Sequence, residues 1–202
     1  MSRPHSNLLR QTNLAMLLTA LRLVLSPIFV FVFLWDSFSG ALACLAIAII
    51  SELTDLFDGM VARRRNEVTD FGKILDPLAD SISRLTIFIC FIYGGQAPIY
   101  LVVFILYRDS MVSTIRTVCA YRGVVVSARR SGKLKAVVQA TAILIILLLR
   151  AVAYKVPEAE DRFVQIDHGI IWVVTIITVL SAIDYLRGNW TVLRQQLKRP
   201  VR

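Results

Sequence analysis

Long apolar blocks separated by short polar and basic segments dominate the pattern of this chain. Each block approaches the roughly 20 residues that an α-helix needs to cross a bilayer. No segment alternates between apolar and polar residues for long enough to predict a membrane β-barrel. Because hydrocarbon leaves no water to satisfy the backbone, helices are favoured. The pattern therefore predicts an all-α integral membrane bundle of six helices, at about 13–35, 38–63, 72–93, 97–120, 133–154 and 166–187.

The basic residues predict how this bundle is oriented. Both terminal segments and the loops after the second and fourth helices are rich in Lys and Arg, whereas the first and third loops contain neither. The fifth loop mixes Lys155 and Arg162 with four acidic residues. Since cytoplasmic loops carry an excess of Lys and Arg, both termini are predicted to be cytoplasmic. Residues 3–10 are predicted to form a short interfacial segment on the anionic leaflet, with a frayed terminus as the alternative.

Composition narrows the class of protein. The 202 residues are 56% hydrophobic and carry a formal net charge of +9. This charge would suit nucleic acid or an anionic membrane, but no zinc-finger, helix-turn-helix or RNP-like pattern accompanies it, so nucleic acid is not expected. The three cysteines lie inside apolar blocks without a CxxC pair, which argues against a disulfide framework. With no internal repeat or linker, residues 1–202 are predicted to form a single domain.

Four aspartates lie within the second and third predicted helices or their first cytoplasmic turns, where acids are functional candidates. Asp55 and Asp58 are three residues apart and Asp76 and Asp80 four apart, so each pair projects from one helical face. In an antiparallel hairpin Asp55 and Asp80 lie equally far from the midpoint, and the four carboxylates should meet at one level. Such a cluster needs cations among its members, and hard oxygen ligands suit Mg²⁺, Mn²⁺ or Ca²⁺. We therefore predict a site for two divalent ions, Mg²⁺ or Mn²⁺, that can clamp a diphosphate.

Small and basic residues follow the first two acids. Gly59 and Ala62 would allow a ligand close to the backbone, and Arg63 is placed to meet a phosphate. The alternative is that the two small residues merely permit tight packing of helices.

The residues of this hairpin also carry a resemblance to a known family. Asp55-Leu-Phe-Asp58-Gly59-Met-Val-Ala62-Arg63, followed by Gly72, Asp76 and Asp80 at fixed spacing, is similar at every defined position to the signature of the CDP-alcohol phosphotransferases. The resemblance implies that Asp55, Asp58 and Asp76 bind metal. It further implies that Asp80 touches a metal and is the catalytic base on the acceptor hydroxyl.

The resemblance also implies where the nucleotide binds. Gly59, Ala62 and Arg63 are expected near it, and Thr19 and Arg22 match the pattern of the family's first helix. That pattern usually has an Asn at the position of Met16 here.

Two further segments resemble the phosphatidylglycerophosphate synthase branch of the family: residues 69–80 and Ser131-Gly-Lys133-Leu-Lys135. The acceptor there is glycerol 3-phosphate, a small phosphorylated alcohol. The cations proposed to bind it are Arg108, Arg116, Lys133 and Lys135. Arg108 could instead pair structurally with Asp109 or Asp184. The branch usually has Lys or Arg at the position of Ser81, with Arg84 a turn later here, and inositol phosphate is an alternative acceptor.

The function implied is transfer of a phosphatidyl group from CDP-diacylglycerol to glycerol 3-phosphate, with release of CMP. The resemblance implies a multi-pass homodimer in the cell membrane, among membrane lipids, with its active site on the cytoplasmic side. A transporter or ion-binding membrane protein is the alternative from another class. Transport normally uses polar or broken elements in more than one repeat, whereas the acids here lie on a single hairpin.

Overall fold

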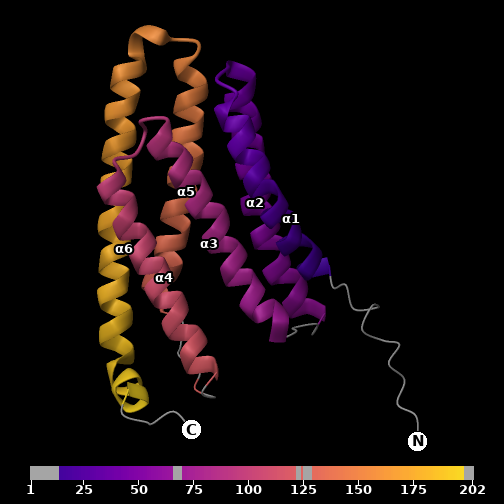
Figure 1. The fold of residues 1–202 in the computed structure, drawn as a ribbon, viewed down its shortest axis with the longest axis vertical. Helices are drawn as coiled ribbons and strands as arrows, with labels where there is room; N and C mark the ends of the chain where they lie inside the picture. Colours follow the sequence, from indigo (N-terminus) through magenta and orange to yellow (C-terminus); the bar gives the residue numbers. More distant parts are fainter. Residues whose placement is uncertain (1–13, 66–69, 122–123, 125–128, 198–202) are drawn as a thin grey trace, which may run out of the picture.

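The computed structural model describes residues 14–65, 70–121, 124 and 129–197, and over these ranges it contains helices and no strand (Figure 1). The long helices are α1 (Leu14–Leu34), α2 (Phe38–Arg65), α3 (Asp70–Tyr93), α4 (Ile99–Tyr121), α5 (Arg130–Ala153) and α6 (Glu160–Leu197). A short 3₁₀ helix, η2 (Pro157–Ala159), precedes α6. The all-α class predicted from the apolar blocks is confirmed.

The long helices form two groups of three that lie side by side (Figure 1). In the first group α1 packs against α2 and α3, and in the second α6 packs against α4 and α5. The groups meet where α2 contacts α5 and where α3 contacts α4. This packing brings residues of α1, α2 and α3 together although they are far apart in sequence.

Apolar side chains from every long helix form one core. Phe29 and Phe33 of α1 stack with ring centroids 5.9 Å apart, and Phe33 lies 6.4 Å from Phe91 of α3. Phe88 meets Phe91 edge-on at 6.2 Å. These rings hold α1 against α3, because large aromatic side chains contribute both buried area and a preferred relative orientation.

The outside of the bundle is apolar as well, as expected for a surface that faces lipid. Phe31 is 75% exposed and Phe104 56% exposed, far more apolar exposure than a soluble monomer of this size normally tolerates. Among the described residues, four stretches are long and apolar enough to span a membrane: Leu17–Leu34, Phe38–Asp55, Arg130–Ala153 and Pro157–Trp190. The structure thus describes an all-helical protein with several candidate membrane spans.

The helices α3 and α4 are long enough to cross a membrane but are not among those four stretches. Each contains several charged residues, among them Asp80 and Arg84 in α3 and Arg108, Asp109 and Arg116 in α4. These charges lower the mean hydropathy of both helices.

The sixth helix differs from its prediction. It was expected at about 166–187, but α6 runs from Glu160 to Leu197. Pro157 at the start of η2 and the acids Glu160 and Asp161 in the first turn of α6 favour a helix start there. Glu160, Asp161 and Arg162, which the sequence pattern places in the fifth loop, are therefore helical residues. The apolar run marks only the central part of the helix.

The predicted interfacial segment 3–10 lies outside the described residues.

Candidate active site at one end of the bundle

Two of the four predicted acids meet at a single cation. Arg22 of α1 donates from Nη1 to Oδ1 of Asp55 on α2 at 2.7 Å, and the same nitrogen contacts Oδ1 of Asp80 on α3. The Arg22 side chain is 2% exposed, so the contact is shielded from solvent. The two carboxylates lie at the same level of the hairpin, as their spacing predicts. Arg22, predicted to bind the nucleotide, is in this structure a counter-ion of both acids.

Two hydroxyl groups fix α1 against α3 one turn away from this contact. Ser26 donates to the backbone oxygen of Arg22 at 2.9 Å, and its Oγ lies 2.9 Å from Oγ of Ser83. Thr19, the other residue of the predicted first-helix pattern, is fully buried one turn before Arg22. Buried polar groups of this kind specify one register, because a shift would leave them without partners.

The other hairpin residues are only partly described. Asp58 lies on α2 and Asp76 on α3, but the structure does not describe their side chains or those of Ala62 and Arg63, nor the surroundings of Gly59. Among the side chains that the structure describes, no group of three or more potential metal ligands occurs. The Asp55 and Asp80 carboxylates do fit a divalent ion, since they are neighbouring oxygen donors that remain 29% and 35% exposed beside Arg22. The four-aspartate site itself stays a prediction.

Arg84 and Glu52 join this charged group, and neither was among the predicted site residues. Arg84 Nη2 lies 3.5 Å from Oε2 of Glu52 and 4.0 Å from Oδ2 of Asp55. The sequence spacing could have indicated both residues, because Glu52 precedes Asp55 by one helical turn and Arg84 follows Asp80 by one turn. Residues at that spacing share a helical face.

A second charged group lies across the bundle, on α4 and α5. Lys135 donates from Nζ to both carboxylate oxygens of Asp109, at 2.6 and 2.8 Å. Arg108 Nη1 donates to Oδ1 of Asp109 at 3.0 Å, and its Nε donates to Ser181 of α6 at 3.1 Å. Two predicted acceptor cations therefore share one carboxylate. The pairing of Arg108 with Asp109, considered as the structural alternative, is present.

The other two predicted acceptor cations are more exposed. The Arg116 guanidinium lies over the Tyr185 ring of α6, 5.6 Å from its centroid, and Lys133 is exposed near the start of α5. Asp184 of α6 pairs with Arg129 at 2.8 Å and accepts a hydrogen bond from Ser131. The structure thus brings Arg108 and Lys135 together but leaves Lys133 apart from them.

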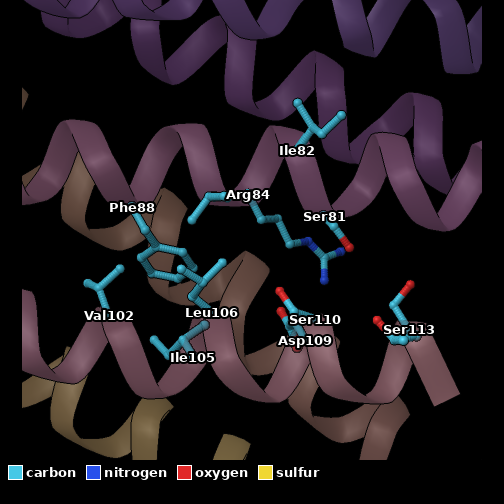
Figure 2. Close-up of a pocket in the computed structure, with 12 residues that line it drawn as sticks. Ser81, Ile82, Arg84, Phe88, Val102, Ile105, Leu106, Asp109, Ser110 and Ser113 are labelled. Atoms are coloured by element: carbon cyan, nitrogen blue, oxygen red, sulfur yellow. The ribbon is translucent and has the colours of Figure 1, made fainter.

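A cavity of about 240 Å³ separates the two charged groups, between α3 and α4 (Figure 2). Arg84 points from α3 across it toward Asp109 and Ser110 of α4 (Figure 2). Among the described residues that line the cavity, the two charged ones are therefore Arg84, which also contacts the acids of the first half, and Asp109, which pairs with the cations of the second half.

Chemically, the Asp55 and Asp80 carboxylates beside Arg22 are suited to hold a metal ion. The largely buried Arg108 and Lys135 are suited to hold a phosphate.

The fold and this site define a multi-pass helical membrane protein with a polar, multiply charged site at one end of its bundle. A model of the CDP-alcohol phosphatidyltransferase family matches residues 12–180, and the chain belongs to this family. The chain is 34% identical over 194 residues to the Bacillus subtilis CDP-diacylglycerol–glycerol-3-phosphate 3-phosphatidyltransferase, covering 90% of this chain and 97% of that protein.

Two other relatives are similar over most of their length. The Treponema pallidum protein of the same name is 30% identical over 158 residues, with 77% of this chain and 73% of that protein covered. A probable phosphatidylglycerophosphate synthase of Mycobacterium tuberculosis is 35% identical over 181 residues, with 88% of this chain and 81% of that protein covered.

Proposed function

We propose that this protein is a membrane transferase that moves a phosphatidyl group from CDP-diacylglycerol to glycerol 3-phosphate and releases CMP in phospholipid biosynthesis. Family membership supports the reaction class, and the names of the relatives favour glycerol 3-phosphate over inositol phosphate as acceptor. The structural observation that carries the proposal is the convergence of Asp55 and Asp80, from two neighbouring helices, on the buried Arg22.

Asp55, Asp58, Asp76 and Asp80 are the residues that we propose to hold two divalent ions, Mg²⁺ or Mn²⁺. Bound there, the ions would polarise the diphosphate and stabilise the leaving phosphate. Arg22 would keep Asp55 and Asp80 in place, and Gly59, Ala62, Arg63 and Thr19 are the further residues proposed around the nucleotide.

In the reaction Asp80 would accept the proton of the acceptor hydroxyl as a general base. The acceptor oxygen then forms a bond to the phosphorus that carries the diacylglycerol. The bond from that phosphorus to the bridging oxygen breaks, and CMP leaves with the bond's electron pair. Arg108 and Lys135, with Arg116 and Lys133 nearer solvent, would hold the acceptor phosphate, and fixing both substrates supplies much of the rate.

The same proposal includes the topology. Six membrane spans require that α3 and α4 also cross, which is supported by lipid-facing side chains such as Ile89, 54% exposed, and Ile99, 63% exposed. The loop charges favour both termini and the active site on the cytoplasmic side of the cell membrane. A homodimer of single-domain subunits is proposed from the family resemblance alone.

The deciding experiment uses purified full-length protein with CDP-diacylglycerol, Mg²⁺ and a panel of acceptors, and measures release of CMP. We expect rapid release with glycerol 3-phosphate and little with inositol phosphate or serine. Preferential use of inositol phosphate would overturn the acceptor, and no release with any acceptor would overturn the reaction. Chelation of divalent ions should stop the release, and activity that persists in chelator would contradict the metal site.

A further inference from the structure

The cavity between α3 and α4 changes in character along its length. At the end near the acids it is lined by Arg84 of α3 and by Asp109, Ser110 and Ser113 of α4, and the Asp109 carboxylate is already paired with Arg108 and Lys135. Farther along both helices its walls are Phe88 of α3 and Val102 of α4, which are buried and apolar. Figure 2 shows the same order, with Phe88 and Val102 at one side of the view and Ser81, Arg84 and Ser113 at the other.

The change from a polar end to an apolar end determines which kind of molecule the cavity can bind. A small phosphorylated alcohol has no hydrocarbon to place against Phe88, Val102 and Ile105, whereas an acyl chain gains about 0.8 kcal/mol for each methylene group that it buries. At the other end Arg84 offers a guanidinium group suited to a phosphate, and the serine hydroxyls can donate to ester carbonyls. An amphiphile with a phosphate at one end of a hydrocarbon chain matches both ends.

The cavity also adjoins the candidate active site. Arg84 Nη2 is 4.0 Å from Oδ2 of Asp55, and Ser81, which lines the cavity, directly follows Asp80. A phosphate at the polar end would therefore lie beside the acids proposed to hold metal.

We propose that this cavity receives one acyl chain of the CDP-diacylglycerol donor, with Arg84 beside the donor's diphosphate. The inference rests on the proposed function and adds to it the residues that sense acyl-chain length. Ile105 and Leu106 line the apolar part, and we assign chain-length selectivity to them.

The test compares two neighbouring positions on α4. Leu106 lines the cavity and is 36% exposed, whereas Val103 is 38% exposed and is not among the lining residues. Leu106→Trp would fill part of the cavity, and Val103→Trp adds the same ring on the same helix outside it. For each protein Kd is measured for dioctanoyl and dipalmitoyl CDP-diacylglycerol without acceptor, and KM for both donors is then measured from CMP release.

We expect Leu106→Trp to raise Kd and KM for the dipalmitoyl donor on the order of tenfold, equivalent to about two buried methylene groups. Values for the dioctanoyl donor and the KM for glycerol 3-phosphate should stay near wild type, as should all values for Val103→Trp. Leu106→Phe, which adds less volume, gives a smaller shift of the same kind if the tryptophan variant does not fold.

Each other outcome counts against the assignment or against the function separately. If Leu106→Trp affects both donors equally or neither, the cavity does not hold the acyl chain. If it changes only the oligomeric state in detergent, a second copy of the chain covers the cavity instead. If wild-type protein binds both donors with the predicted chain-length effect but releases no CMP, the proposed reaction fails while the acyl-chain site stands.

Discussion

The two halves of the bundle carry opposite charge excesses at the same end. In α1–α3 three described carboxylates meet two guanidinium groups: Glu52, Asp55 and Asp80 with Arg22 and Arg84. In α4–α6 three cations meet two carboxylates: Arg108, Arg129 and Lys135 with Asp109 and Asp184. The first half is suited to additional cations and the second to additional anions.

This difference explains how one small bundle can serve two phosphate-bearing substrates. If all these groups packed together they would neutralise one another and leave no binding capacity. The cavity between α3 and α4 keeps the two groups apart while Arg84 reaches into it from one side (Figure 2). Each half therefore keeps its own excess of negative or positive charge. Substitutions in the acidic half should lower kcat, whereas substitutions in the basic half should weaken binding of the acceptor.

The largest effect should come from the acidic half, with Asp80→Asn. The amide keeps the shape of the side chain but cannot take a proton, so kcat for CMP release should fall about 10²–10⁴-fold, the range that general-base catalysis supplies. The matched control is Asp36→Asn at the opposite end of the bundle, where the carboxylate is 82% exposed and kcat should not change. Retained activity in folded Asp80→Asn protein would remove Asp80 from the mechanism.

A large effect on stability is expected from Arg22→Met. This change leaves the Asp55 and Asp80 carboxylates without their shared cation, and breaking a buried pair costs about 3–5 kcal/mol. The thermal midpoint in chelator should therefore fall strongly. Because divalent ions would supply the missing positive charge, added Mg²⁺ should recover more of the midpoint in the variant than it adds to wild type.

Arg150→Met is the control for this measurement. Arg150 of α5 is also largely buried, and it donates to the backbone oxygen of Phe33 with its guanidinium carbon 3.5 Å from the Phe33 ring centroid, at the end of α1 opposite to Arg22. Its loss should lower the midpoint without any extra recovery by Mg²⁺. Equal recovery in both variants would show that Mg²⁺ acts elsewhere.

The relative level of Asp55 and Asp80 could be predicted from the sequence, for a physical reason. Asp55 and Asp80 lie on helices joined by a short loop, so helical periodicity and hairpin geometry fix their relative level. The contact between Arg22 and Asp80 joins residues 58 positions apart and depends on α1 packing against α3, which no local pattern specifies. Arg22 was accordingly predicted to be important, but with the nucleotide as its partner.

In the basic half the structure separates cations that the sequence places in one group, and their role in binding the acceptor stays a prediction. Arg108, Arg116, Lys133 and Lys135 were grouped by charge and position alone. Residues two apart on a helix do not face the same way, so Lys133 and Lys135 of α5 cannot both point into the bundle. Which of them turns inward depends on Asp109, a carboxylate on another helix that only the packed structure supplies.

The smallest expected effect is a difference in acceptor KM between substitutions of the buried Lys135 and the exposed Lys133 of α5. Lys135→Met removes a cation that is 8% exposed, and Asp109 keeps Arg108 as its partner, so the protein should fold. Because hydrogen bonds to charged groups contribute about 1.5–3 kcal/mol, KM for glycerol 3-phosphate should rise about 10–100-fold with little change in KM for the donor. Lys133→Met removes an exposed cation and should raise the same KM by about twofold, in line with weak interactions at exposed charges. The measurement is CMP release at varied acceptor concentration. If the two variants raise KM equally, the buried ion cluster has no special role, and the two halves differ in charge without differing in function.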